Sequence, residues 1–303
     1  FVGITLVESL ALWALLYFGA GIAAALRWIV AEATVAELAG DARRGRIVGA
    51  FETMIGASFV VGPALLALLG SNGAGARRAS AVAVALAAAA LLASFAVRAP
   101  AASAPVGRVP RLGWRGVADA LGAAPTVMAA GFVGGFFEGG LAALLPLYGL
   151  AAGFGAASSA LLVSASGLGS TLAMLPAGAA ADRQPRQRVM RMCAALTLAG
   201  TLALPWAAGF GALAGGLAFV WGGAGGALYT LAMIDLGHRH RGLELVNATA
   251  VLVLAYTAGG LLAPLAGGAA LQVSPRLGFP LLLAAVAAAG CIALALPPRG
   301  ARR

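Results

Sequence analysis

Long apolar runs alternate with short polar connections along almost the whole chain. Each run is about 20 residues long, which is the length that an α-helix needs to cross the hydrocarbon core of a bilayer. The stretch 1–7 is apolar but too short to span, and it is typical of the tail of a helix. The pattern therefore predicts an all-α polytopic membrane protein. Its nine whole spans are predicted at 10–32, 47–69, 80–97, 123–148, 156–181, 189–207, 211–235, 244–270 and 278–296.

The composition agrees with this class. The 303 residues are 61% hydrophobic and 10% charged, and the mean hydropathy is +0.96, whereas soluble domains are about 25% charged. The net charge of +10 comes from arginines that lie almost entirely in the connections, which indicates the lipid bilayer and not a nucleic acid as the partner. Cys193 and Cys291 lie in or beside distant spans and are interpreted as small hydrophobic residues, so neither a disulfide nor a metal site is predicted.

The arginines gather on alternate connections. Sixteen of the 20 lie in the segments 41–46, 98–115, 183–191, 238–241 and 299–303, and the connections between these segments hold three. Basic residues concentrate on the cytoplasmic side of membrane proteins. We therefore expect these segments, the C-terminus included, to face the cytoplasm from the cytoplasmic (inner) membrane.

One connection is much longer than the others. Residues 98–118 contain three prolines and four arginines, and clustered prolines are typical of a segment between regular elements. We expect a cytoplasmic linker here. It would join a first part, 1–97, to a second part with six spans, 119–303.

The chain also repeats itself. Segment 43–46 (Arg-Arg-Gly-Arg), an apolar helix and a proline at position 63 are echoed by segment 239–242 (Arg-His-Arg-Gly), an apolar helix and a proline at position 264. The two copies are about 200 residues, or six spans, apart. Internal six-helix repeats are characteristic of secondary transporters, although alanine-rich helices can also resemble one another by chance.

The connection before span 189–207 carries a recognisable pattern. Its spacing, Gly-x-x-x-Asp-Arg-x-x-Arg-x-Arg, is formed by Gly178, Asp182, Arg183, Arg186 and Arg188. The pattern resembles the cytoplasmic loop signature of the major facilitator superfamily of transporters, except that Pro185 stands where the family has glycine. The alternative is a short inside loop that merely collects arginines.

Further segments extend the likeness in the same order along the chain. They resemble the fourth and fifth helices with the loop between them, and the tenth and eleventh helices, of YcaD-type major facilitator proteins. The segments are 17–22, Trp28 with Glu32, 44–46, 221–229 and 247–264. The resemblance covers essentially the whole chain.

The resemblance implies a fold of twelve helices in two six-helix halves. The nine whole spans would be helices four to twelve, and 1–7 would be the end of helix three. Two further helices and most of a third, with a first copy of the signature loop, are expected upstream. The implied activity is secondary active transport of a small solute by a monomer that alternates access between its halves.

The signature loop supplies the expected gate. The resemblance implies that Asp182 faces the start of the helix near Gly45, in the other half, where free N–H groups and the helix dipole favour a carboxylate. Arg183, Arg186 and Arg188 are expected to add ion pairs between the halves. A solvated topology anchor is the alternative for all of these charges.

Charged residues inside spans are the candidates for proton coupling. Glu138 lies deep in span 123–148, where a charge costs several kcal/mol unless it is paired, wet or protonated. We expect the protonated form to be favoured, which suits a group that takes and releases a proton; a neutral acid that serves only packing is the alternative. Gly131, Gly135 and Gly139 share one face of the same span and are expected to let another helix approach closely.

Arg27 also lies inside a predicted span, and it is expected to face the transport cavity or a buried acid. Glu32 and Glu52 lie at similar depth and are its candidate partners. Arg27 and Glu32 are five residues apart, about 140° around one helix, so a direct pair within the helix is awkward.

Two other classes of function remain as alternatives. A polytopic membrane enzyme would need a cluster of acids, histidines or cysteines, and the ten acids are spread along the chain. A sensor without transport on the same fold is the other. No ATP-binding loop of the Gly-x-x-x-x-Gly-Lys type is present. We therefore expect no cofactor, and energy from an ion gradient, most simply protons, or from the solute itself.

Overall fold

The computed structural model describes residues 9–69, 74–96, 113–207 and 211–296, and all regular structure within them is helical. Eight of the helices are long and apolar enough to cross a membrane. In chain order the helices are α2 (Leu10–Leu38), α3 (Arg44–Leu69), α4 (Ala74–Ala96), α5 (Trp114–Ala123), α6 (Pro125–Ala151), α7 (Ala156–Arg183), α8 (Arg186–Ala207), α9 (Gly211–Arg239), α10 (Gly242–Val273) and α11 (Gly278–Ala295).

Nine of these helices correspond to the nine predicted spans, and the differences lie in the connections. Helix α4 already begins at Ala74, so the arginines at 77 and 78 lie in its first turns and not in a loop. Most of the predicted linker, 98–112, lies outside the described residues, but its last part is helical because α5 begins at Trp114. The prolines of the linker stop at position 110, so none of them interrupts α5.

The chain forms two compact units. The first consists of residues 1–31 and 57–106 and therefore holds most of α2, the end of α3, and α4. Its large apolar side chains, such as Leu15, Phe18, Leu92 and Phe95, are exposed. A helix that is apolar all round is stable only when it is buried in protein or in lipid, so these surfaces fit contact with lipid.

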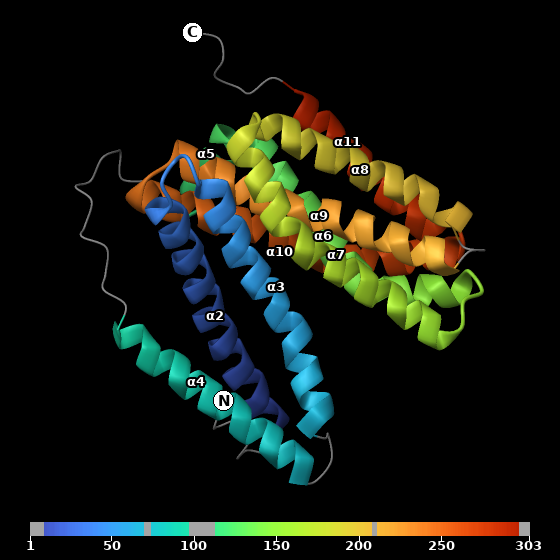
Figure 1. Ribbon diagram of the computed structural model, residues 1–303, viewed down its shortest axis with the longest axis horizontal. Helices are drawn as coiled ribbons and strands as arrows, with labels where there is room; N and C mark the ends of the chain where they lie inside the picture. The colour runs from blue at the N-terminus through green and yellow to red at the C-terminus, as the bar shows by residue number, and fades with distance from the viewer. Residues whose placement is uncertain (1–8, 70–73, 97–112, 208–210, 297–303) are drawn as a thin grey trace. The chain divides into compact units, whose positions relative to one another are not determined.

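The second unit consists of residues 32–56 and 107–303. Helices α6 and α9 form its centre: α7 and α8 pack on α9, while α10 and α11 pack on α6 (Figure 1). Helix α9 is buried along most of its length. The last turns of α2 and the first half of α3 belong to this unit as well.

Glycines on α6 allow α10 to approach it closely, as the sequence predicts. A methyl group on Gly135 would collide with the backbone carbonyl of Tyr256, and one on Gly139 would collide with the backbone of Gly260. A methyl group on Gly131 would instead meet the side chain of Leu252. Close backbone approach increases dispersion contact, which is the main attraction between helices in lipid.

Replacing Gly135 with alanine is therefore expected to destabilise the protein by about 1–3 kcal/mol, the usual cost of overpacking. The matched control is Gly268→Ala in α10, where an added methyl group meets no atom within 4 Å. Thermal unfolding in detergent should show a lower midpoint for Gly135→Ala and an unchanged or higher one for Gly268→Ala. Equal midpoints for the two variants would show that the α6–α10 contact is not tight.

Candidate functional site

Five polar side chains from five helices meet in the second unit, and we call them the acid–tyrosine cluster. The Tyr229 hydroxyl on α9 donates a hydrogen bond to Glu32 at the end of α2, with 2.6 Å between the oxygens. The Tyr256 hydroxyl on α10 donates to Glu138 on α6, at 2.8 Å. The two tyrosine rings are in contact, with 4.7 Å between their centroids. Glu52 on α3 completes the cluster.

The carboxyl of Glu52 lies next to that of Glu32. Glu32 is 1% exposed and Glu52 is 3% exposed, so neither is solvated. Within the described residues, Oε1 of Glu52 has no hydrogen-bond partner. Two neighbouring carboxyls can hydrogen-bond to each other only when one of them carries a proton, so a dry pair of this kind favours the protonated form of one acid.

The other end of the cluster is less enclosed. Glu138 and Tyr256 are half-buried, whereas Tyr229 is buried. Arg27 is exposed and belongs to the first unit, so its expected pairing with Glu32 or Glu52 stays a prediction. Tyr229 is one partner of Glu32. A phenol suits a dry site because it donates a hydrogen bond without a charge of its own.

The cluster joins the two proposed copies of the sequence repeat. Glu32 and Tyr229 are 197 residues apart, as are Gly45 and Gly242 in the first turns of α3 and α10. This separation is close to the offset of about 200 residues that the sequence indicates.

A second set of contacts lies at the end of the unit that carries the Asp182 loop. Oδ1 of Asp182 accepts a hydrogen bond from the backbone N–H of Gly45 at 2.6 Å, and Oδ2 accepts one from that of Arg46 at 3.0 Å. These groups open helix α3, where N–H groups have no partner within the helix. The contact expected for Asp182 is thus present, and its role in gating stays a prediction.

Gly178 makes this contact possible. It lies one turn before Asp182 on α7, and a methyl group at either Gly178 or Gly45 would collide with the backbone carbonyl of the other. Further along the same crossing, Thr53 donates a hydrogen bond to the carbonyl of Thr171 at 3.2 Å. The first half of α3 and the last half of α7 therefore lie backbone to backbone.

The arginines of the loop differ from the expectation. Arg186 pairs with Asp235 on α9 at 3.0 Å, and this carboxylate also binds Arg239 at 2.7 Å. Both partners lie in the second sequence repeat, so this is not an ion pair between halves. Arg183 and Arg188 are exposed and form no ion pair with described residues. The buried carboxylate of Asp235 attracts the nearest guanidinium, whereas an exposed arginine gains little from pairing.

Asp41, in the connection between α2 and α3, lies among positive groups of both repeats. It accepts hydrogen bonds from Arg44 at 2.6 Å and from Arg241 at 3.3 Å, and His238 lies 3.6 Å away. The hydrogen bond from Arg44 is the main cause that lowers the pKa of the Asp41 carboxyl below its ordinary value. Asp41 therefore stays ionised throughout the neutral range.

Glu37 makes a contact at the start of α10 that is equivalent to the contact of Asp182 at the start of α3. Its Oε1 accepts a hydrogen bond from the backbone N–H of Gly242 at 3.2 Å, at the start of α10. Gly242 and Gly45 are equivalent positions of the repeat. Both helix starts are thus bound by a carboxylate from the other repeat, which is the polarity that the helix dipole favours.

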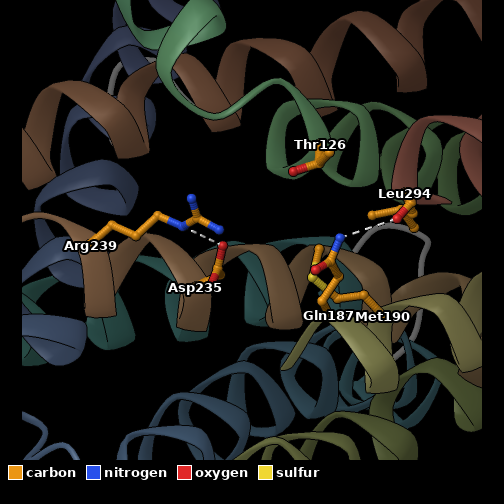
Figure 2. Close-up of a pocket in the computed structure, with 6 residues that line it drawn as sticks. All are labelled: Thr126, Gln187, Met190, Asp235, Arg239 and Leu294. Carbon is orange, nitrogen blue, oxygen red and sulfur yellow. Dashed lines mark hydrogen bonds and ion pairs between the residues drawn. The ribbon is translucent and has the colours of Figure 1, made fainter. Parts of the chain in front are cut away.

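A small pocket lies beside Asp235 at the same end of the unit (Figure 2). Gln187 on α8 donates a hydrogen bond to the carbonyl of Leu294 on α11 at 3.3 Å, which closes one side. The pocket is lined by Thr126, Gln187, Met190, Asp235, Arg239 and Leu294. Its one carboxylate, Asp235, already pairs with two arginines, so little of its charge is available to bind a ligand.

Sequence reasoning missed Tyr229 and Tyr256 as parts of the site. Both lie in the interior of apolar helices, and a buried tyrosine hydroxyl usually finds a hydrogen-bond partner. That rule was the available signal, because the spans contain only a few acids that could accept a hydrogen bond from a tyrosine hydroxyl. The sequence could not show which acid each tyrosine meets.

Similar proteins are found at the level of the family and of the fold. A family model described as Major Facilitator Superfamily matches residues 1–242. No curated protein matches the chain. Among solved structures, a variant of the E. coli fucose:proton symporter FucP is similar, with a TM-score of 0.64, 15% identity, and coverage of 89% of this chain and 73% of that one. FucP in an outward conformation gives a TM-score of 0.65, 14% identity, and coverage of 89% and 72%. At such identities the likeness shows the fold alone.

Proposed function

The chain belongs to the Major Facilitator Superfamily, whose model matches residues 1–242, and we propose that it is a secondary active transporter coupled to protons. It moves a small solute across the cytoplasmic membrane by alternating access between two half-bundles, and it acts as a monomer of the YcaD-like subgroup. The Asp182 loop and the C-terminus face the cytoplasm, as the distribution of arginines indicates.

The acid–tyrosine cluster is the observation that carries this proposal. Three carboxyls lie within apolar helices, where each must be protonated, paired or wet. Glu32 and Glu52 come from the predicted first half, and Glu138 comes from the second. A movement of one half against the other changes the surroundings of all three carboxyls and therefore their affinity for protons. The similarity to the fold of a proton symporter supports the same reading.

The Asp182 contact supplies the switch. Its two hydrogen bonds join α7 to the first turn of α3, so they hold the two halves together at the proposed cytoplasmic end. Opening this end requires both bonds to break. The described contacts therefore fit a state that is closed to the cytoplasm, which alternates with one in which α3 and α7 separate there.

Reconstituted liposomes of the full-length protein test the proposal. A panel of small neutral, anionic and cationic solutes is applied across a pH gradient while the electrical current and the solute content are recorded. At least one solute should move in a direction that reverses with the gradient, and a protonophore should abolish this movement. A sensor would move none of the solutes, and an enzyme would convert a solute chemically instead of displacing it.

A further inference from the structure

We infer that the acid–tyrosine cluster binds the solute directly and that the solute is an organic cation, which displaces protons from the carboxyls of Glu52 and Glu138. The inference rests on the proposed transport function and adds to it the charge of the solute. Four observations lead to it: the charge balance of the cluster, a buried oxygen without a partner, the pair of aromatic rings, and the partial exposure of one end.

The charge balance of the cluster is negative. The cluster holds the carboxyls of Glu32, Glu52 and Glu138, and Glu32 and Glu138 each accept a hydrogen bond from a neutral tyrosine hydroxyl. Arg27 is the one arginine that the sequence places in the middle of a span. Three carboxyls outnumber it even if it faces the same cavity. Protons or an external cation must therefore balance the remaining charge.

Glu52 shows where a ligand would bind. Its side chain is 3% exposed, and among the described residues its Oε1 accepts no hydrogen bond. Buried polar atoms in folded proteins almost always have a partner, and a bare carboxylate oxygen is among the most costly to leave unpaired. An ammonium, amidinium or similar group placed against this oxygen would supply both the charge and the contact.

The two tyrosines add a surface for such a cation. Their ring centroids are 4.7 Å apart and the rings are inclined by 58°, so their faces do not stack flat on one another. The hydroxyls are bound to Glu32 and Glu138, which fixes both rings. Aromatic faces attract organic cations through the negative potential above the ring. No group of His, Cys, Asp or Glu in the described part of the chain could hold a metal ion, so an organic cation fits better than a metal.

The half-buried end of the cluster gives both ligands access. Glu138 and Tyr256 are half-buried, while Glu32, Glu52 and Tyr229 lie deeper. Without solute, the carboxyls must hold protons to stay in an apolar place. When the cation enters, the O–H bond of one of these acids breaks, its proton leaves to water, and the carboxylate that forms pairs with the cation, so that one positive charge replaces another. Solute and protons then occupy the site in turn and cross the membrane in opposite directions.

Proton release on binding tests this exchange without any transport. Tetramethylammonium, tetraethylammonium and tetraphenylphosphonium are added to the full-length protein in detergent with very weak buffer and a pH indicator. At least one of them should release about one proton per molecule bound, and its affinity should rise about tenfold per pH unit while the carboxyls titrate. Tetraphenylborate, which has the shape of tetraphenylphosphonium but the opposite charge, should release none.

Two variants locate the exchange. Glu52→Gln should weaken binding of the active cation at least tenfold and remove most of the proton release, and Glu244→Gln, at an exposed acid, should change neither. If Glu52→Gln does not fold, the pH dependence of the wild-type affinity still decides the matter. Flux of a neutral or anionic solute with no cation binding would overturn this inference and leave the proposed function standing. Cation binding with proton release but without flux would overturn the proposed transport function and leave the cation site standing.

Discussion

Glutamine in place of Glu138 is expected to abolish solute gradients that are driven by a pH gradient. The variant keeps an acceptor for the Tyr256 hydroxyl, which lies 2.8 Å from the carboxyl, but it cannot release a proton. With one proton per solute, a difference of one pH unit supports about a tenfold solute gradient, because 1.4 kcal/mol corresponds to a factor of ten. The ratio for Glu138→Gln should fall to one.

Exchange of labelled for unlabelled solute separates this effect from loss of the fold. Exchange needs binding and alternating access but no net proton transfer, so it should survive in Glu138→Gln when the solute is supplied at a saturating concentration. Glu244→Gln, at an exposed acid on α10, is the matched control and should retain both activities. If Glu138→Gln builds the wild-type gradient, Glu138 serves packing and the buried Glu32–Glu52 pair carries the proton instead.

The helices themselves could be predicted because the bilayer imposes their length. Each span must stay apolar for about 20 residues, and this requirement leaves a strong pattern even in an alanine-rich chain. Helix α5 was missed because ten residues are too few to show that pattern. The start of α4 was missed because glycine and arginine near position 75 are typical of a loop, although a helix end at a membrane surface tolerates both.

The candidate site could be predicted only in part. The contact of Asp182 with the start of α3 was expected only because its loop resembles the family signature, since the two segments are 137 residues apart. Partners inside the bundle could not be predicted in the same way, because helix rotation and depth decide them. Arg186 binds Asp235, 49 residues away, and Glu32 binds Tyr229, 197 residues away. Neither pair leaves a signal in the spacing of a single sequence.

Loss of the Asp182 charge should open the loop end of the protein. Asp182 accepts two backbone hydrogen bonds at the start of α3, from Gly45 and Arg46, and a hydrogen bond to a charged group is worth about 1.5–3 kcal/mol. Asparagine can accept one of the two through its oxygen, but it turns an N–H₂ group toward the other N–H. It also loses the attraction of the helix dipole, typically about 0.3–1 kcal/mol. The ratio of closed to open protein should therefore fall at least about tenfold, since 1.4 kcal/mol is a factor of ten in an equilibrium constant.

Labelling of a cysteine at position 48 measures this change. Val48 lies in the first turns of α3 and is 1% exposed in the closed arrangement, and the native Cys193 and Cys291 are first replaced by alanine. A water-soluble maleimide added from the side of the Asp182 loop should label position 48 at least about tenfold faster in Asp182→Asn, in proportion to the open population. Glu244→Gln removes a carboxylate from the same end without touching α3 and should leave the rate unchanged. Equal rates in Asp182→Asn and the parent, with both proteins folded, would mean that Asp182 anchors the loop but does not hold the two halves together.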